Sequence, residues 1–285
     1  MLAFYGWTDL QLINHVHVKA VCFKNEDADL FVLKIPRISK ALLNEIIKMK
    51  VFSNIYELTP SQSAQSMNTA QKIWMLFSKN KLFKHYKMQL PIGKVYSEFF
   101  TGALWSDARY IIRNLKVTKV NFVEEGTATY DGIEVLSQCM PRPGFKERLL
   151  RRIHFPRDSF ALGKIYMYKP EMCKSSCGLT ITKLPIIKAG SVVHNVLINT
   201  EGDITPFKEA KHIFIAGRGE APPLDLPPNT FVKFHPADKP SLPMEWVYAQ
   251  VDMNQKVLII SSKSTAIYTP QIMFGDDRRS ITWKL

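Results

Sequence analysis

The sequence predicts an α/β protein, because apolar strand-like runs alternate with amphipathic helical patterns along its 285 residues. Strand-like runs occupy 17–23, 28–35, 92–100 and 117–126, and helical patterns occupy 38–52, 70–86 and 105–116. The strand, helix and strand between 92 and 126 form a βαβ unit, whose two strands are expected to be parallel.

Two of the helical patterns have specific support. In 38–52, apolar residues recur at helical spacing, at Leu42, Leu43, Ile46, Ile47 and Val51. In 105–116, Ser106 or Asp107 lies near the start, where a side-chain oxygen can cap the first turn.

A second α/β rhythm follows after a less regular middle region, 139–199, which "PRPG" interrupts. The rhythm covers 210–220, 229–238, 244–251 and 256–275. We therefore expect two doubly wound, Rossmann-like halves that face a central cleft: 1–190, with an irregular linker region, and 191–285. Ligands of such sheets bind outside the carboxyl ends of the strands.

The composition is that of a globular protein, with 46% hydrophobic and 22% charged residues. The formal net charge of +13 predicts an anionic partner. Because zinc-finger spacing and an RNA-recognition signature are both missing, we do not expect nucleic acid to be that partner. The densest basic cluster, 145–157, has apolar residues at helical spacing, so it can either rest on an anionic membrane or form a solvated surface helix.

The N-terminus has neither the basic region nor the cleavage site of a signal peptide, and no apolar run approaches the ~20 residues that span a bilayer. We therefore expect a cytoplasmic protein. The four cysteines are Cys22, Cys139, Cys173 and Cys177, and the CxxxC that the last two form is not a usual zinc spacing. Free thiols are expected.

Three polar motifs follow predicted strands. The first is Glu124-Glu125-Gly126, where glycine permits a tight turn directly after the strand. Two neighbouring carboxylates repel, which can raise the pKa of one of them and suit it to accept a proton. An exposed acidic turn is the alternative interpretation.

The second motif is His235-Pro236, where proline ends a strand and biases the histidine to an extended backbone. Such a histidine can donate a hydrogen bond or a proton to a phosphate leaving group, or it can simply be satisfied at the strand end.

The third motif runs from Ile259 to Tyr268, where an apolar strand leads into hydroxyl residues and a predicted helix. Its hydroxyls are those of Ser261, Ser262, Ser264 and Thr265. Hydroxyls and free N–H groups at a helix start can bind an anion, although one residue suffices as an ordinary cap. Gly217-Arg218-Gly219 provides a comparable turn after another strand.

The order of these motifs, acidic-acidic-glycine, then His-Pro, then Ser-Ser/Thr, resembles that of the bacterial sialyltransferases of lipooligosaccharide and capsule and the related polysialyltransferases. The opening "TDLQLIN" is most similar to glycosyltransferase family 52. The likeness also touches 99–115 and 165–172.

The resemblance implies a GT-B enzyme that takes sialic acid from CMP-sialic acid with inversion and needs neither cofactor nor catalytic metal. Glu125 would be the general base and His235 the acid, and Pro236 would fix the conformation of the loop that carries His235. Ser264 and Thr265 would hold the phosphate, with Ser261, Ser262 and the turn at Gly217 and Arg218 as further donor-side candidates.

The acidic motif departs from the aspartate of several relatives, so the choice between Glu124 and Glu125 stays open, and Asp131 ranks below both. The implied partners are a nucleotide-sugar donor and a glycan acceptor, galactose-terminated and lipid-linked at the inner face of the cytoplasmic membrane. A homodimer is compatible with this assignment. The alternatives are transfer from another sugar nucleotide, polysialyl transfer, and a basic lipid- or nucleic-acid-binding protein without catalysis.

Overall fold

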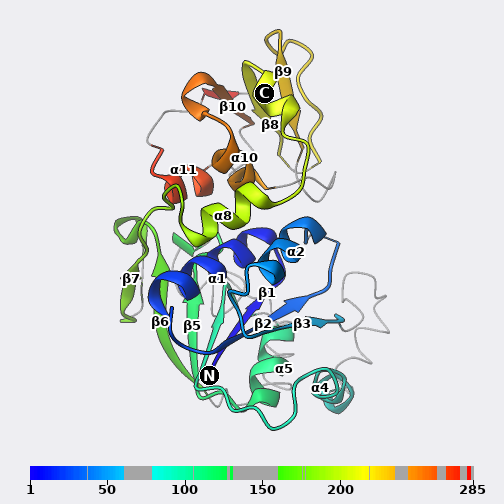
Figure 1. Cartoon of the computed structure of the whole chain (residues 1–285), viewed down its shortest axis with the longest axis vertical. Coiled ribbons are helices and arrows are strands. Elements are labelled where there is room, and N and C mark those ends of the chain that lie inside the picture. Colours follow the sequence, from blue (N-terminus) through cyan, green and yellow to red (C-terminus); the bar gives the residue numbers. More distant parts are fainter. Residues whose placement is uncertain are drawn as a thin grey trace.

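A computed structural model describes most of the chain: residues 1–36, 38–60, 79–104, 106–126, 129–130, 160–174, 176, 178–217, 219–234, 243–261, 268–276 and 281–283. It confirms the α/β class (Figure 1). A seven-stranded sheet contains β1 Leu2–Gly6, β2 Ala28–Leu33, β3 Asn54–Leu58, β4 Glu98–Thr101, β5 Lys119–Val123, β6 Ala161–Met167 and β7 Ile181–Lys183.

All seven strands are parallel, in the order β3-β2-β1-β4-β5-β6-β7. The strand order therefore reverses between β1 and β4. In an open parallel sheet the crevice at such a reversal is the usual place for a ligand.

A second parallel sheet, of four strands in the order β11-β10-β8-β9, follows later in the chain. Its strands are β8 His212–Ile215, β9 Thr230–Lys233, β10 Val257–Ser261 and β11 Ile281–Trp283. These strands fall within the second predicted α/β rhythm, apart from the short β11.

The α-helices are α1 Asp9–Cys22, α2 Lys40–Lys48, α4 Lys79–Lys87, α5 Ser106–Leu115, α8 Val192–Asn199, α9 Thr205–Glu209, α10 Met244–Gln250 and α11 Tyr268–Phe274. Short 3₁₀ helices are formed, among the described residues, by Pro170–Met172 (η2) and Met253–Gln255 (η3). Because crossovers between parallel strands are right-handed, α1 and α5 cover opposite faces of the large sheet. Within the described part of the chain, no helix combines the length and apolarity that a membrane span requires.

Helix α8 lies between the two sheets and packs on α1, α2 and α10 (Figure 1). One hydrophobic core continues from the large sheet through Val196 and Leu197 of α8 to Trp246 of α10 and Ile213 of β8. The indole nitrogen of Trp246 donates a hydrogen bond to the Thr200 carbonyl at the end of α8 (3.0 Å). The two sheets are therefore joined by continuous apolar packing.

The predicted strand over 17–23 is wrong, because these residues belong mainly to α1. Thr8 caps this helix by accepting a hydrogen bond from the Gln11 N–H (3.3 Å). Since α1 is covered by the sheet on one side and by α8 on the other, its polar residues are buried together with its apolar ones. This burial hides the 3.6-residue period on which a helix is normally recognised.

Other predicted elements are confirmed. Strand 28–35 corresponds to β2, helix 38–52 contains α2, helix 105–116 contains α5, and strand 117–126 contains β5. The sequence analysis did not find β1, β3, β6 or β7, and of the strand predicted over 92–100 only 98–100 belong to a strand, β4. The helix predicted over 70–86 is described only from residue 79, where α4 begins.

Gly163 of β6 is a position where no side chain fits. A Cβ atom there would lie 2.2 Å from Asn121 Oδ1 and 2.9 Å from Lys119 Cε, next to an irregularity in the pairing of β5 with β6. The Asn121 Oδ1 atom cannot move away freely, because it accepts a hydrogen bond from the Lys164 N–H (2.8 Å).

We predict that Gly163→Ala lowers the free energy of unfolding by about 2–3 kcal/mol, because the overpacked contact lies on a buried, hydrogen-bonded side chain. Urea denaturation measures this loss. In a protein that already carries Asn121→Ala, Gly163→Ala is expected to lower the free energy of unfolding by less than it does in the wild type. If the losses of the two single variants simply add in the double variant, the clash between Gly163 and Asn121 is contradicted.

Candidate functional site

The acidic motif lies at the carboxyl edge of the large sheet. Strand β5 ends at Val123, so Glu124 and Glu125 follow it directly. The first turn of α1 follows β1, and Gly102 follows β4, at the same edge. These three segments surround the position where the strand order reverses, which makes this edge the candidate site.

Glu124 has a structural role in this arrangement. Its side chain is fully buried, and Oε2 accepts hydrogen bonds from the Tyr130 hydroxyl (2.7 Å) and the Tyr168 N–H (2.9 Å). Burial raises the pKa of Glu124 to about 7, although both hydrogen bonds oppose the rise. Asn14 of α1 donates to the Glu124 carbonyl (2.8 Å), so this residue ties α1 to the ends of β5 and β6.

Glu125 is only partly buried and is therefore the more accessible of the two glutamates. Burial raises its pKa from 4.5 to about 7, and the nearby Gln11 amide opposes the rise. A carboxyl group that is accessible and titrates near neutral pH can take a proton from a ligand at that pH. Of the two open choices, the geometry favours Glu125 as a chemical group.

Gly102 permits a close approach at the centre of the site. A Cβ atom added there would lie 2.7 Å from Gln11 Nε2 and 3.0 Å from both Cβ and Oε2 of Glu125. The amide of Gln11 and the carboxylate of Glu125 therefore converge over this glycine from two different elements, the start of α1 and the end of β5.

Helix α11 reaches the acidic motif from the second sheet. Gly126 has a φ of 98°, which favours glycine, and a Cβ there would lie 3.4 Å from Thr269 Oγ1 of α11. Helix α11 begins shortly after the hydroxyl-rich segment that follows β10. The helix that follows this segment in the sequence is therefore close to the acidic motif.

A buried charged cluster connects the two sheets near this edge: Asp9 in the first turn of α1, Lys233 at the end of β9 and Glu245 in the first turn of α10. Burial raises the pKa of Asp9 to about 6 and that of Glu245 to about 7, and it lowers the pKa of Lys233 to about 8. The lysine charge opposes both carboxyl shifts, and the two carboxylates oppose the lysine shift. Asp9 also accepts a hydrogen bond from the Ser39 N–H (2.8 Å). Favourable charge interactions thus link the start of α1 to the strand that leads to His235.

Of the residues predicted for the site, the structure describes Glu124, Glu125, Gly217 and Ser261. Ser261 is buried at the end of β10, and the Gly217 N–H donates to Glu220 Oε2 (2.7 Å) in the turn after β8. Six predicted residues lie outside the described part of the chain: His235, Pro236, Ser262, Ser264, Thr265 and Arg218. The lower-ranked Asp131, the basic cluster 145–157, Cys139 and Cys177 also lie outside it, whereas Cys22 and Cys173 are free thiols.

The sequence analysis missed five residues of this edge: Asp9, Gln11, Gly102, Lys233 and Glu245. A pattern that could have revealed three of them is the capped helix start "TDLQ" directly after an apolar strand, with "FFTG" ending a second strand. No sequence pattern reveals that Lys233 and Glu245 are buried, because charged residues are normally exposed.

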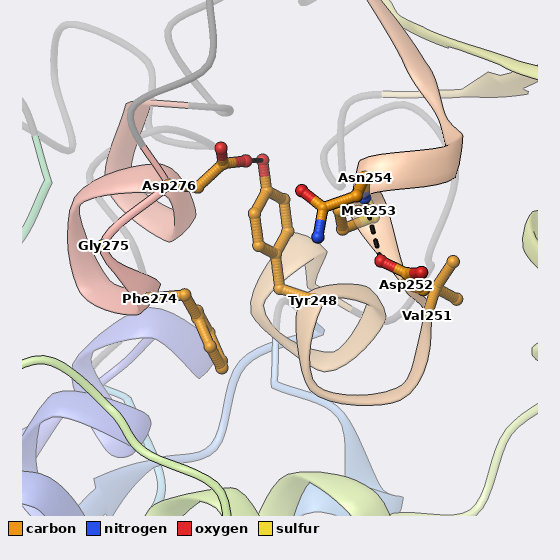
Figure 2. A pocket seen from close by; sticks show the side chains of 8 residues that line it. All are labelled: Tyr248, Val251, Asp252, Met253, Asn254, Phe274, Gly275 and Asp276. Atoms are coloured by element: carbon orange, nitrogen blue, oxygen red, sulfur yellow. Dashed lines mark hydrogen bonds between the residues drawn. The ribbon is translucent and has the colours of Figure 1, made fainter.

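A hollow of about 530 Å³ lies elsewhere, where α10 and α11 end (Figure 2). Tyr248 lines this hollow, and its hydroxyl donates a hydrogen bond to Asp276 Oδ2 (3.0 Å). On another side of the hollow, Asp252 Oδ1 accepts a hydrogen bond from the Asn254 N–H (3.0 Å). Because none of the predicted site residues lines this hollow, the strand edge remains the candidate site.

Comparison with known proteins assigns no family: no protein-family model matches the chain, and no curated protein matches its sequence. Among the residues that the structure describes, no group of three or more His, Cys, Asp or Glu is arranged to hold a metal ion.

The raised pKa of Glu125 predicts a pH-dependent stability difference. A carboxyl group whose pKa is higher in the folded state stabilises the fold below pH ~4.5 and loses this contribution as the pH rises to about 7. Relative to the wild type, Glu125→Gln should therefore gain on the order of 1–3 kcal/mol in unfolding free energy between pH 5 and pH 8.

Urea denaturation at the two pH values measures this difference. Glu201→Gln, at an exposed position, is the control and should follow the wild type at both. A Glu125→Gln variant that also follows the wild type would contradict the burial of this carboxyl group.

Proposed function

We propose that this protein is an inverting glycosyltransferase that transfers sialic acid from CMP-sialic acid to a glycan, and that its two sheets form the halves of a GT-B enzyme. The observation that carries the proposal is the approach of α11 to Gly126, because α11 follows the hydroxyl-rich segment in the sequence and Gly126 belongs to the acidic motif. This contact supports a site that both motifs share.

On the acceptor side, Glu125 accepts the proton of the attacking hydroxyl group, whose oxygen then bonds to the anomeric carbon. The bond from that carbon to the CMP phosphate oxygen breaks, and its electron pair leaves with CMP. The partial exposure of Glu125 and its pKa of about 7 suit this role, because a general base works best when its pKa is near the working pH.

On the donor side, His235 hydrogen-bonds or protonates the departing phosphate, and Pro236 shapes its loop. Ser264 and Thr265 hold the phosphate, with Ser261, Ser262, Gly217 and Arg218 as further donor-side residues. The position of Lys233 supports this assignment, since this residue lies two positions before His235 and interacts with the charge of Asp9 on α1. Hydrogen-bond donors aimed at a leaving anion typically stabilise the transition state by a few kcal/mol.

The positive charge of the chain supports an anionic donor and a glycan acceptor carried on lipid at an anionic membrane surface. In this proposal the protein works in the cytoplasm, at the inner face of the membrane, as a monomer or a homodimer.

The proposal predicts that the wild-type protein releases CMP from CMP-sialic acid, faster with a galactose-terminated acceptor such as lactose, and equally fast in EDTA. Glu125→Gln should lower turnover by about 10²–10⁴-fold, because the proton acceptor is lost. Coupled detection of CMP measures the rate.

Glu124→Gln is the matched control, since the same substitution one residue away removes a buried carboxylate whose partners are structural. It should cost less than about tenfold in turnover. Equal losses in the two variants would contradict the assignment of the base, and loss of CMP release in EDTA would contradict the metal-independent route. Binding of UDP in preference to CMP would instead indicate a different sugar nucleotide.

A further inference from the structure

Gln11 has an orientation that its neighbours determine. Its Oε1 atom accepts a hydrogen bond from the Trp7 N–H (2.8 Å). A backbone N–H can only donate, so the oxygen of the amide must face Trp7 and the NH₂ group must face the other way. The side chain is fully buried, and Nε2 makes no hydrogen bond of normal length with the described residues, although the amide lies close enough to the Glu125 carboxyl group to lower its pKa.

An unpaired amide nitrogen at this depth is unusual, because a buried donor without a partner typically costs ~1–3 kcal/mol. The nitrogen and Oε2 of Glu125 both lie against Gly102, 2.7 Å and 3.0 Å from the position that a Cβ atom would take there. A proton donor and a proton acceptor therefore flank one point, at the edge of the sheet where a ligand is expected.

A hydroxyl group is the simplest chemical group that can bond to both side chains. Its oxygen can accept a hydrogen bond from the amide, and its proton can be donated to the carboxylate. We propose that Gln11 Nε2 and Glu125 Oε2 together bind the reacting hydroxyl group of a sugar acceptor. This inference rests on the proposed function and names the second residue of its acceptor site. Gln11 holds the oxygen while the hydroxyl proton passes to Glu125, so the lone pair that attacks the anomeric carbon is already oriented.

The absence of a side chain at Gly102 is part of this site. A methyl group at this position would lie within 3.0 Å of both polar groups and would push them away from each other. Glycine therefore lets the amide and the carboxyl group converge.

Kinetics of two Gln11 variants test the inference. Gln11→Glu retains an oxygen that can accept from Trp7 but removes the NH₂ donor, and Gln11→Met removes both. With saturating CMP-sialic acid, each should raise the KM for lactose by about 5- to 50-fold, while the KM for the donor changes less than about twofold.

Gln255→Met, at an exposed glutamine, is the control and should leave both constants unchanged. Gln11 variants that fold normally, as judged by circular dichroism, but leave the KM for lactose unchanged would overturn the inference. So would a parallel loss in both KM values, since that pattern indicates a structural role.

A second measurement does not depend on the identity of the donor. In ¹H–¹⁵N NMR spectra, the side-chain amide signal of Gln11, assigned by its disappearance in Gln11→Glu, is followed during titration with methyl β-galactoside, methyl glucoside and glycerol. At least one of these alcohols should shift the signal in the wild type, and the shift should be lost in Gly102→Ala and in Glu125→Ala.

The two measurements separate the two claims. If the wild type releases no CMP but the Gln11 signal still responds to an alcohol in the expected way, the proposed function fails and the hydroxyl site stands. If none of the three alcohols shifts the signal at saturating concentration, the hydroxyl site is overturned whatever the donor.

Discussion

The partial burial of the Glu125 carboxyl group, beside the point where the strand order of the large sheet reverses, is the constraint on which the rest of this structure depends. Burial makes the charged form of Glu125 costly, and this cost brings its pKa to about 7. Such a group persists only where the surrounding packing is strong enough to hold it. We therefore interpret the neighbouring helix α1 and the ends of β5 and β6 as the packing that keeps this carboxyl group in place.

Helix α1 is the main part of that framework. Its Asn14 side chain donates to the Glu124 carbonyl and accepts from the Tyr168 hydroxyl (3.1 Å), while Glu124 holds the ends of β5 and β6 together. These are buried hydrogen bonds whose partners are fixed, so they favour one arrangement of the strand ends over others. A helix with so many buried polar side chains contributes less to stability than an apolar one would, but it specifies the position of the site.

The sequence allowed the α/β class, the parallel βαβ unit and the position of the acidic motif at a strand end to be predicted, because these depend on local periodicity and on glycine. It did not allow the roles of Glu124 and Glu125 to be distinguished. Adjacent residues point to different sides of the chain, and only the packing of α1 and β6 shows which side is buried. Gln11 was missed for a related reason, since the mistaken strand over 17–23 obscured the helix in which it lies.

The charged cluster of Asp9, Lys233 and Glu245 is a further feature that local patterns could not reveal, because its members come together only when the two sheets pack through α8. Such a cluster is costly to bury and is held by mutual attraction. Its charge interactions link β9, which precedes His235 in the sequence, to the helix that carries Gln11.

Titration of the Glu125 carboxyl carbon by NMR is the most direct test of this account. The signal can be assigned by its disappearance in Glu125→Gln, and its chemical shift followed from pH 3 to pH 9 reports the protonation of this one group. The account predicts a midpoint near 7. A midpoint near the ordinary glutamate value of ~4.5 would show a solvated acidic turn and would contradict the account.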